Sequence, residues 1–100
     1  MNGIQQIDLR ALKKWQAQEK KFILVDVREV HEHEEFNIGG QLVPLSDLGP
    51  FIEKVLPNSC LVLYCRKGLR SQLAIQRIKG MRKDLDCYNL TGGIYELMNS

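Results

Sequence analysis

Apolar residues form two continuous runs in this chain, at residues 22–27 and 61–64, with Asp26 as the single charged position. Such runs are typical of interior strands in a parallel sheet that helices cover on both faces. Shorter segments at residues 4–7, 41–43 and 87–90 are predicted to be further strands. We therefore expect a sheet of about five strands.

Segments with helical spacing of apolar residues lie between these strands. The predicted helices cover residues 9–18, 29–36, 47–56, 71–79 and 94–98. Asp8 is a suitable N-cap for the first, Gly49 and Pro50 should interrupt the third, whose apolar face includes Leu56, and Gly80 should end the fourth. Strands that alternate with helices predict a three-layer α/β domain with a mainly parallel sheet and helices on both faces.

The length of 100 residues corresponds to one domain, residues 1–100. The formal net charge is +2, but residues 1–50 hold 6 basic and 8 acidic side chains, whereas residues 51–100 hold 8 and 4. An excess of basic groups in the second half suits a small anionic substrate, although a solvated basic surface would give the same count. We expect no nucleic-acid partner.

No apolar run approaches the roughly 20 residues that a bilayer requires, and no apolar signal segment opens the sequence. We therefore expect a cytoplasmic protein with no membrane partner. The three cysteines, Cys60, Cys65 and Cys87, form no paired spacing, which fits a reducing compartment.

Cys65 stands where the second buried run ends and a helical segment begins. The start of a helix offers free N–H groups and a positive dipole end, which favour a thiolate over a thiol. The following residues add cationic groups and one flexible position: Arg66, Lys67, Gly68, Leu69 and Arg70. We predict that Cys65 is a nucleophile and that the amides of residues 66–70 surround its sulfur. Arg70 is expected to close the ring, and Arg66 and Lys67 are expected to bind an anion at the rim.

Asp26 is the exception within a buried strand, and a buried carboxylate needs partners. Arg28 or backbone N–H groups are the candidates, and we expect both residues to support the strand end structurally. His31 and His33 follow in an acidic segment. Two positions apart on a helix, they point to different sides, so we expect a solvated acidic helix and no metal site.

The segment from Cys65 to Ser71 resembles the cysteine loop of the rhodanese (sulfurtransferase) family. Three other segments are similar to motifs of that family and occur in the same order. They are Leu24-Val25-Asp26-Val27-Arg28-Glu29, the stretch Glu35-Phe36-Asn37-Ile38-Gly39-Gly40 with Leu42-Val43-Pro44-Leu45, and Leu90-Thr91-Gly92-Gly93. At the second of these, Asn37 and Gly39 stand where the family usually has His and Pro.

The resemblance implies a five-stranded parallel sheet and a ping-pong transfer of sulfane sulfur. Carried over by position, Cys65 is the nucleophile, and residues 66–70 cradle its persulfide. The resemblance also implies a small anionic donor such as thiosulfate, an acceptor such as cyanide, a thiol or a sulfur-carrier protein, and no cofactor. Asp26 and Arg28 match positions that are usually structural in the family.

Two other functions are compatible with the pattern. Some phosphatases carry a similar cysteine loop with five residues between Cys and Arg, but only four separate Cys65 from Arg70 here. The chain could instead be a non-catalytic or regulatory module, including the C-terminal part of a protein that activates sulfur carriers. Cys60 and Cys87 are expected to be buried apolar side chains, with a role in resolving the persulfide as the alternative.

Overall fold

The computed structural model describes residues 3–99, so the ends of the predicted domain 1–100 lie outside the described residues. Its strands form one five-stranded sheet in the order β1-β5-β4-β2-β3, and every neighbouring pair is parallel. The strands are β1 (Gln5–Ile7), β2 (Ile23–Asp26), β3 (Gln41–Leu42), β4 (Cys60–Tyr64) and β5 (Asp86–Leu90). The predicted α/β class and parallel sheet are confirmed.

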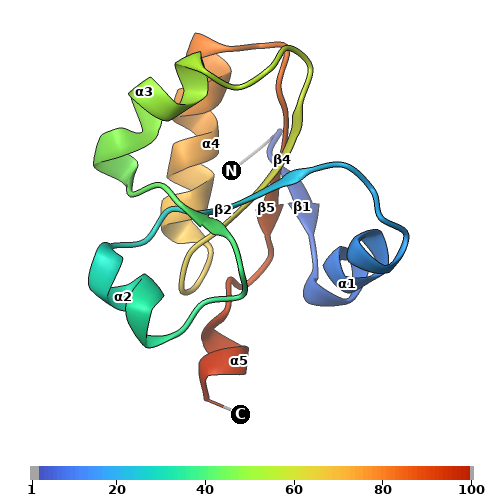
Figure 1. Cartoon of the computed structure of the whole chain (residues 1–100), viewed down its shortest axis with the longest axis vertical. Helices are drawn as coiled ribbons and strands as arrows, with labels where there is room; N and C mark the ends of the chain where they lie inside the picture. The colour runs from blue at the N-terminus through green and yellow to red at the C-terminus, as the bar shows by residue number, and fades with distance from the viewer. Residues whose placement is uncertain (1–2, 100) are drawn as a thin grey trace.

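Helices cover both faces of this sheet (Figure 1). They are α1 (Leu9–Ala17), α2 (Val30–Glu35), α3 (Leu48–Glu53), α4 (Leu69–Met81) and α5 (Tyr95–Met98), with a short 3-10 turn, η1 (Leu45–Asp47), before α3. Asp8 caps α1 as expected, since its carboxylate accepts the amide N–H of Ala11 at 2.8 Å. The short α5 lies beyond the sheet, near the end of the chain.

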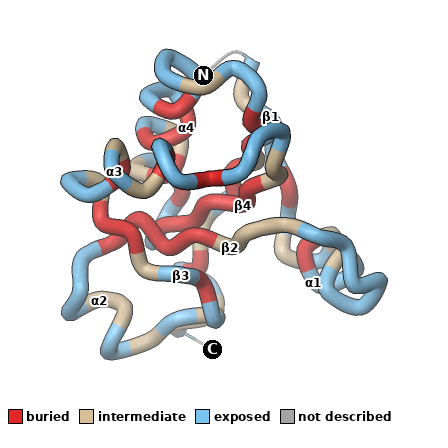
Figure 2. Tube along the Cα trace, turned by 45° about the horizontal axis from the view of Figure 1, so that its top comes forward, coloured by how far each residue is buried: buried red, intermediate tan, exposed pale blue. Residues whose placement is uncertain are grey.

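Two apolar clusters form the core, one on each face of the sheet. Successive side chains of a strand point to opposite faces, so β4 contributes to both. Leu61, Leu63 and Cys65 face α3 and α4, whereas Val62 and Tyr64 face the other cluster, which includes residues of α1. Figure 2 shows β4 as a buried strand in the middle of the molecule.

Three helix details differ from the prediction. Helix α4 runs through Gly80 to Met81, because Gly80 is exposed and the amide of Arg82 continues to bond to the Ile78 carbonyl. Pro50 does not interrupt α3 but lies in its first turn, where a helix needs no internal N–H bond. Leu56 lies beyond α3 and is 76% exposed, so it does not contribute to the core.

The longest helix has 13 residues. Within residues 3–99, none of the helices is both long enough and apolar enough to cross a membrane.

Candidate functional site

The Cys65 sulfur lies at the carboxyl end of β4, just before α4, and the residue is only 1% exposed. Its Sγ accepts the amide N–H of Gly68 at 3.1 Å and that of Ser71 at 3.5 Å. Gly68 has φ +97°, a left-handed conformation that glycine adopts without strain. This turn directs two amides of the loop and first helical turn at one sulfur atom.

The loop is shorter than the sequence suggested. Leu69 and Arg70 already belong to α4, so residues 65–68 alone form the connection. Among the amides of residues 66–70, only that of Gly68 is within hydrogen-bonding distance of Sγ, and the second donor, Ser71, lies one residue further on. The expected ring of amides is therefore reduced to two N–H groups around the sulfur atom itself.

A pocket of about 360 Å³ opens above the sulfur and is lined by Cys65, Arg66, Lys67, Leu69 and Arg70. The cationic ends of Arg66 and Lys67 lie 5.2 and 4.8 Å from the centre of the Tyr95 ring. Leu69 is 73% exposed and adds an apolar wall. The pocket thus joins positive charge to an apolar edge directly above the thiol.

Arg70 does not stand alone above the sulfur. Its guanidinium donates two hydrogen bonds, of 2.6 and 2.8 Å, to the carboxylate of Glu32 on α2. These bonds lower the pKa of Glu32 to about 2, and they also raise the pKa of Arg70. Glu32 additionally accepts the Glu29 amide at 3.0 Å, which caps α2. Arg70 lines the pocket, but its charge is paired with the Glu32 carboxylate.

Asp26 and Arg28 are both fully buried and form the expected pair, with Nε and Nη2 donating to the carboxylate at 3.0 and 2.9 Å. Burial opposes ionisation of Asp26, but hydrogen bonds from Arg28 and His33 hold its pKa below the usual value. Arg28 also donates to the Phe36 carbonyl at 2.6 Å, so the pair ties β2 to the end of α2. This arrangement fits a structural role.

The sequence predicted that the acidic helix α2 is solvated. In the structure, two of its side chains instead contact other elements. His33 Nδ1 lies 2.8 Å from an Asp26 carboxylate oxygen, and Glu32 reaches Arg70. These contacts could not be predicted from the sequence, because both depend on where α2 packs. Within residues 3–99, no group of three or more His, Cys, Asp and Glu side chains is arranged to hold a metal ion.

The turn after β5 supports the cysteine loop from below. The amides of Ile94 and Tyr95 donate to the carbonyls of Cys65 and Arg66 at 3.2 and 2.9 Å. Gly93 has φ +63°, and a side chain there would overlap those two carbonyl oxygens. The Gly92-Gly93 pair could be recognised from the sequence as a turn, but its contact with the loop could not.

Cys60 and Cys87 lie away from this site. Cys60 begins β4, about 16 Å from Cys65 at roughly 3.3 Å per strand residue, and is half-buried rather than fully buried. Cys87 pairs in register with Leu61, and Leu61 itself lies about 13 Å from Cys65 along β4 on the same scale. Burial raises the pKa of the Cys87 thiol to about 11. Because a disulfide needs Cα atoms within about 7 Å, neither cysteine reaches Cys65 in this fold.

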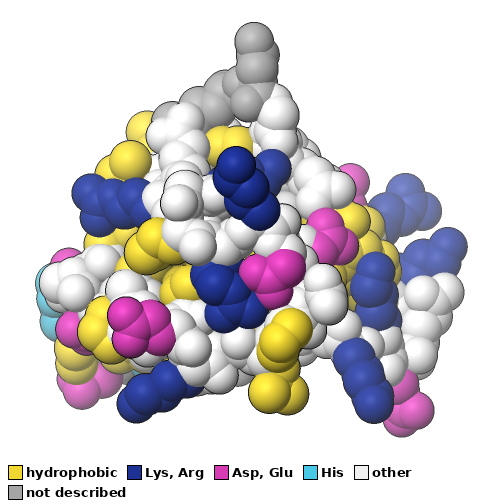
Figure 3. Space-filling model, turned by 90° about the horizontal axis from the view of Figure 1, so that it is seen from above, with side chains coloured by type: hydrophobic (Ala, Val, Ile, Leu, Met, Phe, Trp, Pro, Cys, Tyr) yellow, Lys and Arg dark blue, Asp and Glu magenta, His cyan; other side chains and the backbone are white. Residues whose placement is uncertain are grey.

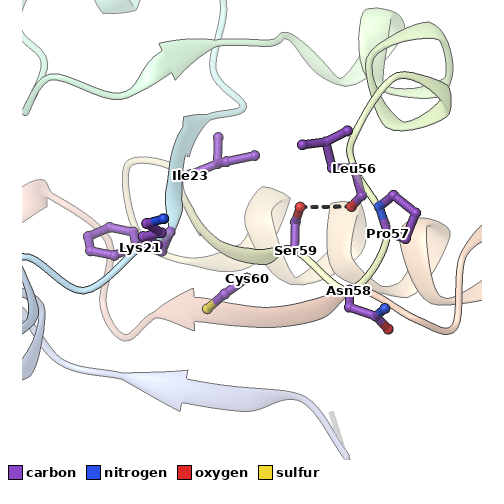
Figure 4. A pocket seen from close by; sticks show the side chains of 8 residues that line it. Lys21, Ile23, Leu56, Pro57, Asn58, Ser59 and Cys60 are labelled. Carbon is purple, nitrogen blue, oxygen red and sulfur yellow. Dashed lines mark hydrogen bonds between the residues drawn. The ribbon is translucent and has the colours of Figure 1, made fainter.

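A second pocket, which Cys60 lines, lies at the opposite edge of the sheet, where β2 and β4 begin. In Figure 4, the Cys60 sulfur points away from Leu56 and Pro57, and Ser59 donates to the Leu56 carbonyl at 2.7 Å. Figure 3 views the molecule over the end of α4 that lies farthest from the cysteine loop; on that face, basic side chains stand among acidic and apolar ones. The Cys65 pocket is the stronger candidate for chemistry, because basic residues line it and two amides donate to its thiol sulfur.

A cysteine that ends a central parallel strand and receives amides from the next helix defines the class of this domain. The model of the family described as "Rhodanese-like domain" matches residues 8–100, and the chain belongs to this family. The similar solved structures include a rhodanese-like domain protein from Staphylococcus aureus, with a TM-score of 0.82 and 22% sequence identity. That comparison covers 92% of this chain and 89% of the other.

Two curated relatives are named for sulfur chemistry. The chain is 35% identical over 88 residues to a Mycobacterium tuberculosis protein named "Probable adenylyltransferase/sulfurtransferase MoeZ", covering 85% of this chain and 22% of MoeZ. It is 28% identical over 79 residues to YrkF of Bacillus subtilis, a candidate sulfur carrier, covering 78% of this chain and 43% of YrkF. The chain therefore spans less than half the length of either relative.

Proposed function

We propose that this chain is a sulfurtransferase that carries sulfane sulfur as a persulfide on Cys65. The observation that supports this most directly is the pair of amides, from Gly68 and Ser71, that donate to the Cys65 sulfur at the start of α4. A helix N-terminus favours negative charge on a cysteine sulfur, and a thiolate is the reactive form. Membership of the rhodanese-like family and two relatives named for sulfur chemistry support sulfur transfer in general terms.

The first half-reaction takes sulfur from a small anionic donor such as thiosulfate. The Cys65 thiolate attacks the outer, sulfane sulfur, a new S–S bond forms, and the S–S bond of thiosulfate breaks. Sulfite leaves with the bonding electron pair, and the negative charge remains on the outer sulfur of the persulfide. Arg66 and Lys67 at the rim are suited to bind the sulfonate oxygens of the donor.

The second half-reaction returns the cysteine to its thiolate. A thiolate acceptor or cyanide attacks the outer sulfur, the S–S bond of the persulfide breaks, and Cys65 leaves as the anion. The basic residues of the pocket, including Arg70, would stabilise the charged outer sulfur meanwhile. Because an unmodified thiolate persists in a reducing compartment, we place the reaction in the cytoplasm.

The test combines intact-mass measurement with steady-state kinetics. After treatment with thiosulfate, the wild type should gain the mass of one sulfur atom, and cyanide should remove it. Cys65→Ala should neither gain the sulfur nor transfer it, because no other residue of the pocket is a thiol. Cys60→Ser is the matched control, and it should behave like the wild type. Kinetics with thiosulfate and several thiol acceptors would then rank the partners.

Three outcomes would contradict the proposal. Sulfur transfer by Cys65→Ala at the wild-type rate would exclude a Cys65 persulfide. Hydrolysis of an aryl phosphate that is lost in Cys65→Ser, without sulfur transfer, would instead favour a phosphatase. A folded wild-type chain that takes up no sulfur from any donor would favour a non-catalytic module.

A further inference from the structure

A chain of polar side chains connects the edge strand β1 with the Cys65 sulfur. Gln6 on β1, Asn89 on β5 and Leu63 on β4 stand in one row of the sheet, so their side chains share the face that α4 covers. Ser71 and Asn89 are 0% and 1% exposed, whereas Gln6 is exposed at the sheet edge. The exposed Gln6 is therefore connected to the Cys65 sulfur through the buried side chains of Asn89 and Ser71.

The direction of these hydrogen bonds is set by one backbone carbonyl. The carbonyl oxygen of Gly68 can only accept, so Gln72 must present its Nε2 there, at 2.9 Å. The Oε1 of Gln72 then faces Gln6, which donates its Nε2 at 3.4 Å. Gln6 is left with its Oε1 towards Asn89 and Thr91, which donate to it at 2.9 and 3.2 Å.

The same logic continues from Asn89 to the sulfur. Because the Nδ2 of Asn89 is used for Gln6, its Oδ1 faces Ser71, and the Ser71 hydroxyl donates to it. The Ser71 Oγ lies 3.4 Å from the Cys65 Sγ. A hydroxyl has one proton, so Ser71 can only accept on its sulfur side. The network thus holds Ser71 ready to accept the S–H of a Cys65 thiol.

A thiolate has no proton to offer, and this changes what the network does. To donate to the sulfur anion, the Ser71 hydroxyl has to turn away from Asn89. That turn leaves the buried Oδ1 of Asn89 without its donor, which is costly. Without the turn, the anion faces an oxygen lone pair. In either case the two backbone amides favour the anion, while the Asn89–Ser71 bond opposes it.

We propose that Asn89 is a positioning residue that restrains the reactivity of Cys65 by fixing the hydroxyl of Ser71 as an acceptor. The inference rests on the proposed function in one respect, namely that Cys65 is the reacting group. Removing the carbonyl oxygen at position 89 frees the Ser71 hydroxyl to donate to the thiolate, and Cys65 then becomes more reactive.

The experiment measures alkylation of Cys65 by iodoacetamide at a fixed neutral pH, with peptide mass spectrometry to follow this cysteine alone. Asn89→Leu should react about threefold to thirtyfold faster than the wild type, since a buried acceptor no longer competes for the hydroxyl. Ser71→Ala combined with Asn89→Leu should react like Ser71→Ala alone. If Asn89→Leu merely loosened the site, it would accelerate alkylation equally in the wild type and in Ser71→Ala. That result would overturn the proposal.

Gln6→Leu tests the same network from the surface, where a substitution leaves the core intact. Without the Gln6 acceptor, the Asn89 amide is free to turn and donate to Ser71, whose proton then points at the sulfur. We expect faster alkylation of Cys65 in Gln6→Leu, and again no effect in the Ser71→Ala background. Gln5→Leu is the matched control, because Gln5 is exposed on the same strand but bonds to Asp86 and the Cys87 carbonyl.

Thermal unfolding of each variant shows whether it is folded at the assay temperature. If Asn89→Leu is unfolded there, the alkylation rate of Gln6→Leu tests the proposal. Wild-type alkylation rates in both Asn89→Leu and Gln6→Leu would overturn the proposal. Alkylation requires no sulfur transfer, so the two ideas fail separately. If the rates follow the expected order in a protein that transfers no sulfur, the network stands and the proposed function falls.

Discussion

Arg70 shows how one residue can serve both the pocket and the packing of a neighbouring helix. Its two hydrogen bonds to Glu32 hold the guanidinium at the edge of the pocket and join α4 to α2. A bidentate pair of this kind has defined geometry, although partial exposure limits its contribution to stability. The site therefore keeps a positioned cation whose charge Glu32 partly offsets.

Glu32→Gln should lower stability at neutral pH by about 1 kcal/mol, as expected for a partly exposed pair. Glu32 has its pKa lowered from 4.5 to about 2, so its contribution is complete above pH 4.5 and is lost as the pH falls towards 2. The difference between wild type and variant should therefore shrink on acidification. Urea unfolding at about pH 7 and about pH 3 would measure it.

Glu34→Gln is the matched control for that experiment, since Glu34 is an exposed carboxylate of the same helix. It should change stability little at either pH. An equal, pH-dependent loss in Glu34→Gln would mean that the net charge of α2, rather than the pair with Arg70, is responsible.

Arg66 and Lys67 are the basic residues at the rim of the pocket. Arg66→Ala should raise the KM for thiosulfate about tenfold and change kcat little, because Arg66 is placed to bind the donor rather than the reacting sulfur. Lys83→Ala removes one exposed positive charge beyond the far end of α4 and should leave KM unchanged. A parallel rise in both variants would indicate attraction by net charge alone.

At the scale of elements, the cysteine loop depends on a turn that follows a different strand. The turn after β5 donates two amides to the carbonyls of Cys65 and Arg66, and Gly93 allows the close approach. The loop is therefore held on one side by α4 and on the other by the start of α5. Its shape therefore depends both on the helix that follows it directly and on a turn about 25 residues further along the sequence.

Gly93→Ala should destabilise the protein by about 3 kcal/mol, since it combines a strained positive φ with overlap against the loop backbone. It should also slow sulfur transfer in the molecules that remain folded. Gly92→Ala is a close control, because Gly92 also has a positive φ, of +73°, but open space around it. Thermal unfolding should show a distinctly smaller loss for Gly92→Ala, and equal losses would exclude the contact with the loop as the cause.

Elements with continuous apolar runs could be predicted from the sequence, and so could the position of Cys65. Every residue of strands β2 and β4 is buried or half-buried, which leaves an unambiguous apolar pattern. The partners of Glu32, His33 and Asn89 could not be predicted, because each is contributed by another element and local spacing carries no information about it. The end of α4 was missed because an exposed glycine in a helix costs only about 1 kcal/mol.

At the scale of the whole molecule, the parallel sheet separates Cys65 from the two other free cysteines. Cys65 follows the carboxyl end of β4, whereas Cys60 begins that strand and Cys87 lies one residue into β5. The fold thus keeps the candidate nucleophile apart from thiols that could trap it.

Thiosulfate treatment should therefore produce a persulfide and no internal disulfide. The intact mass should rise by one sulfur atom, and peptide mapping should place that atom on Cys65. The Cys60→Ser and Cys87→Ser variants should give the same yield, since neither cysteine reaches Cys65. A product lighter by two hydrogen atoms, with a Cys65 cross-link, would require large movement of the sheet and would contradict this arrangement.

The turn at Gly93 has a consequence for the order of events while the protein is being made. A ribosome synthesises residues 65–68 before residues 91–98, and the carbonyls of Cys65 and Arg66 cannot accept the amides of Ile94 and Tyr95 until that later segment emerges. Strand β1, although synthesised before the other strands of this sheet, also waits for β5, its neighbour in the sheet. The sulfur site therefore takes its final shape only after the segment 91–98, which is synthesised later than the cysteine itself, has left the ribosome.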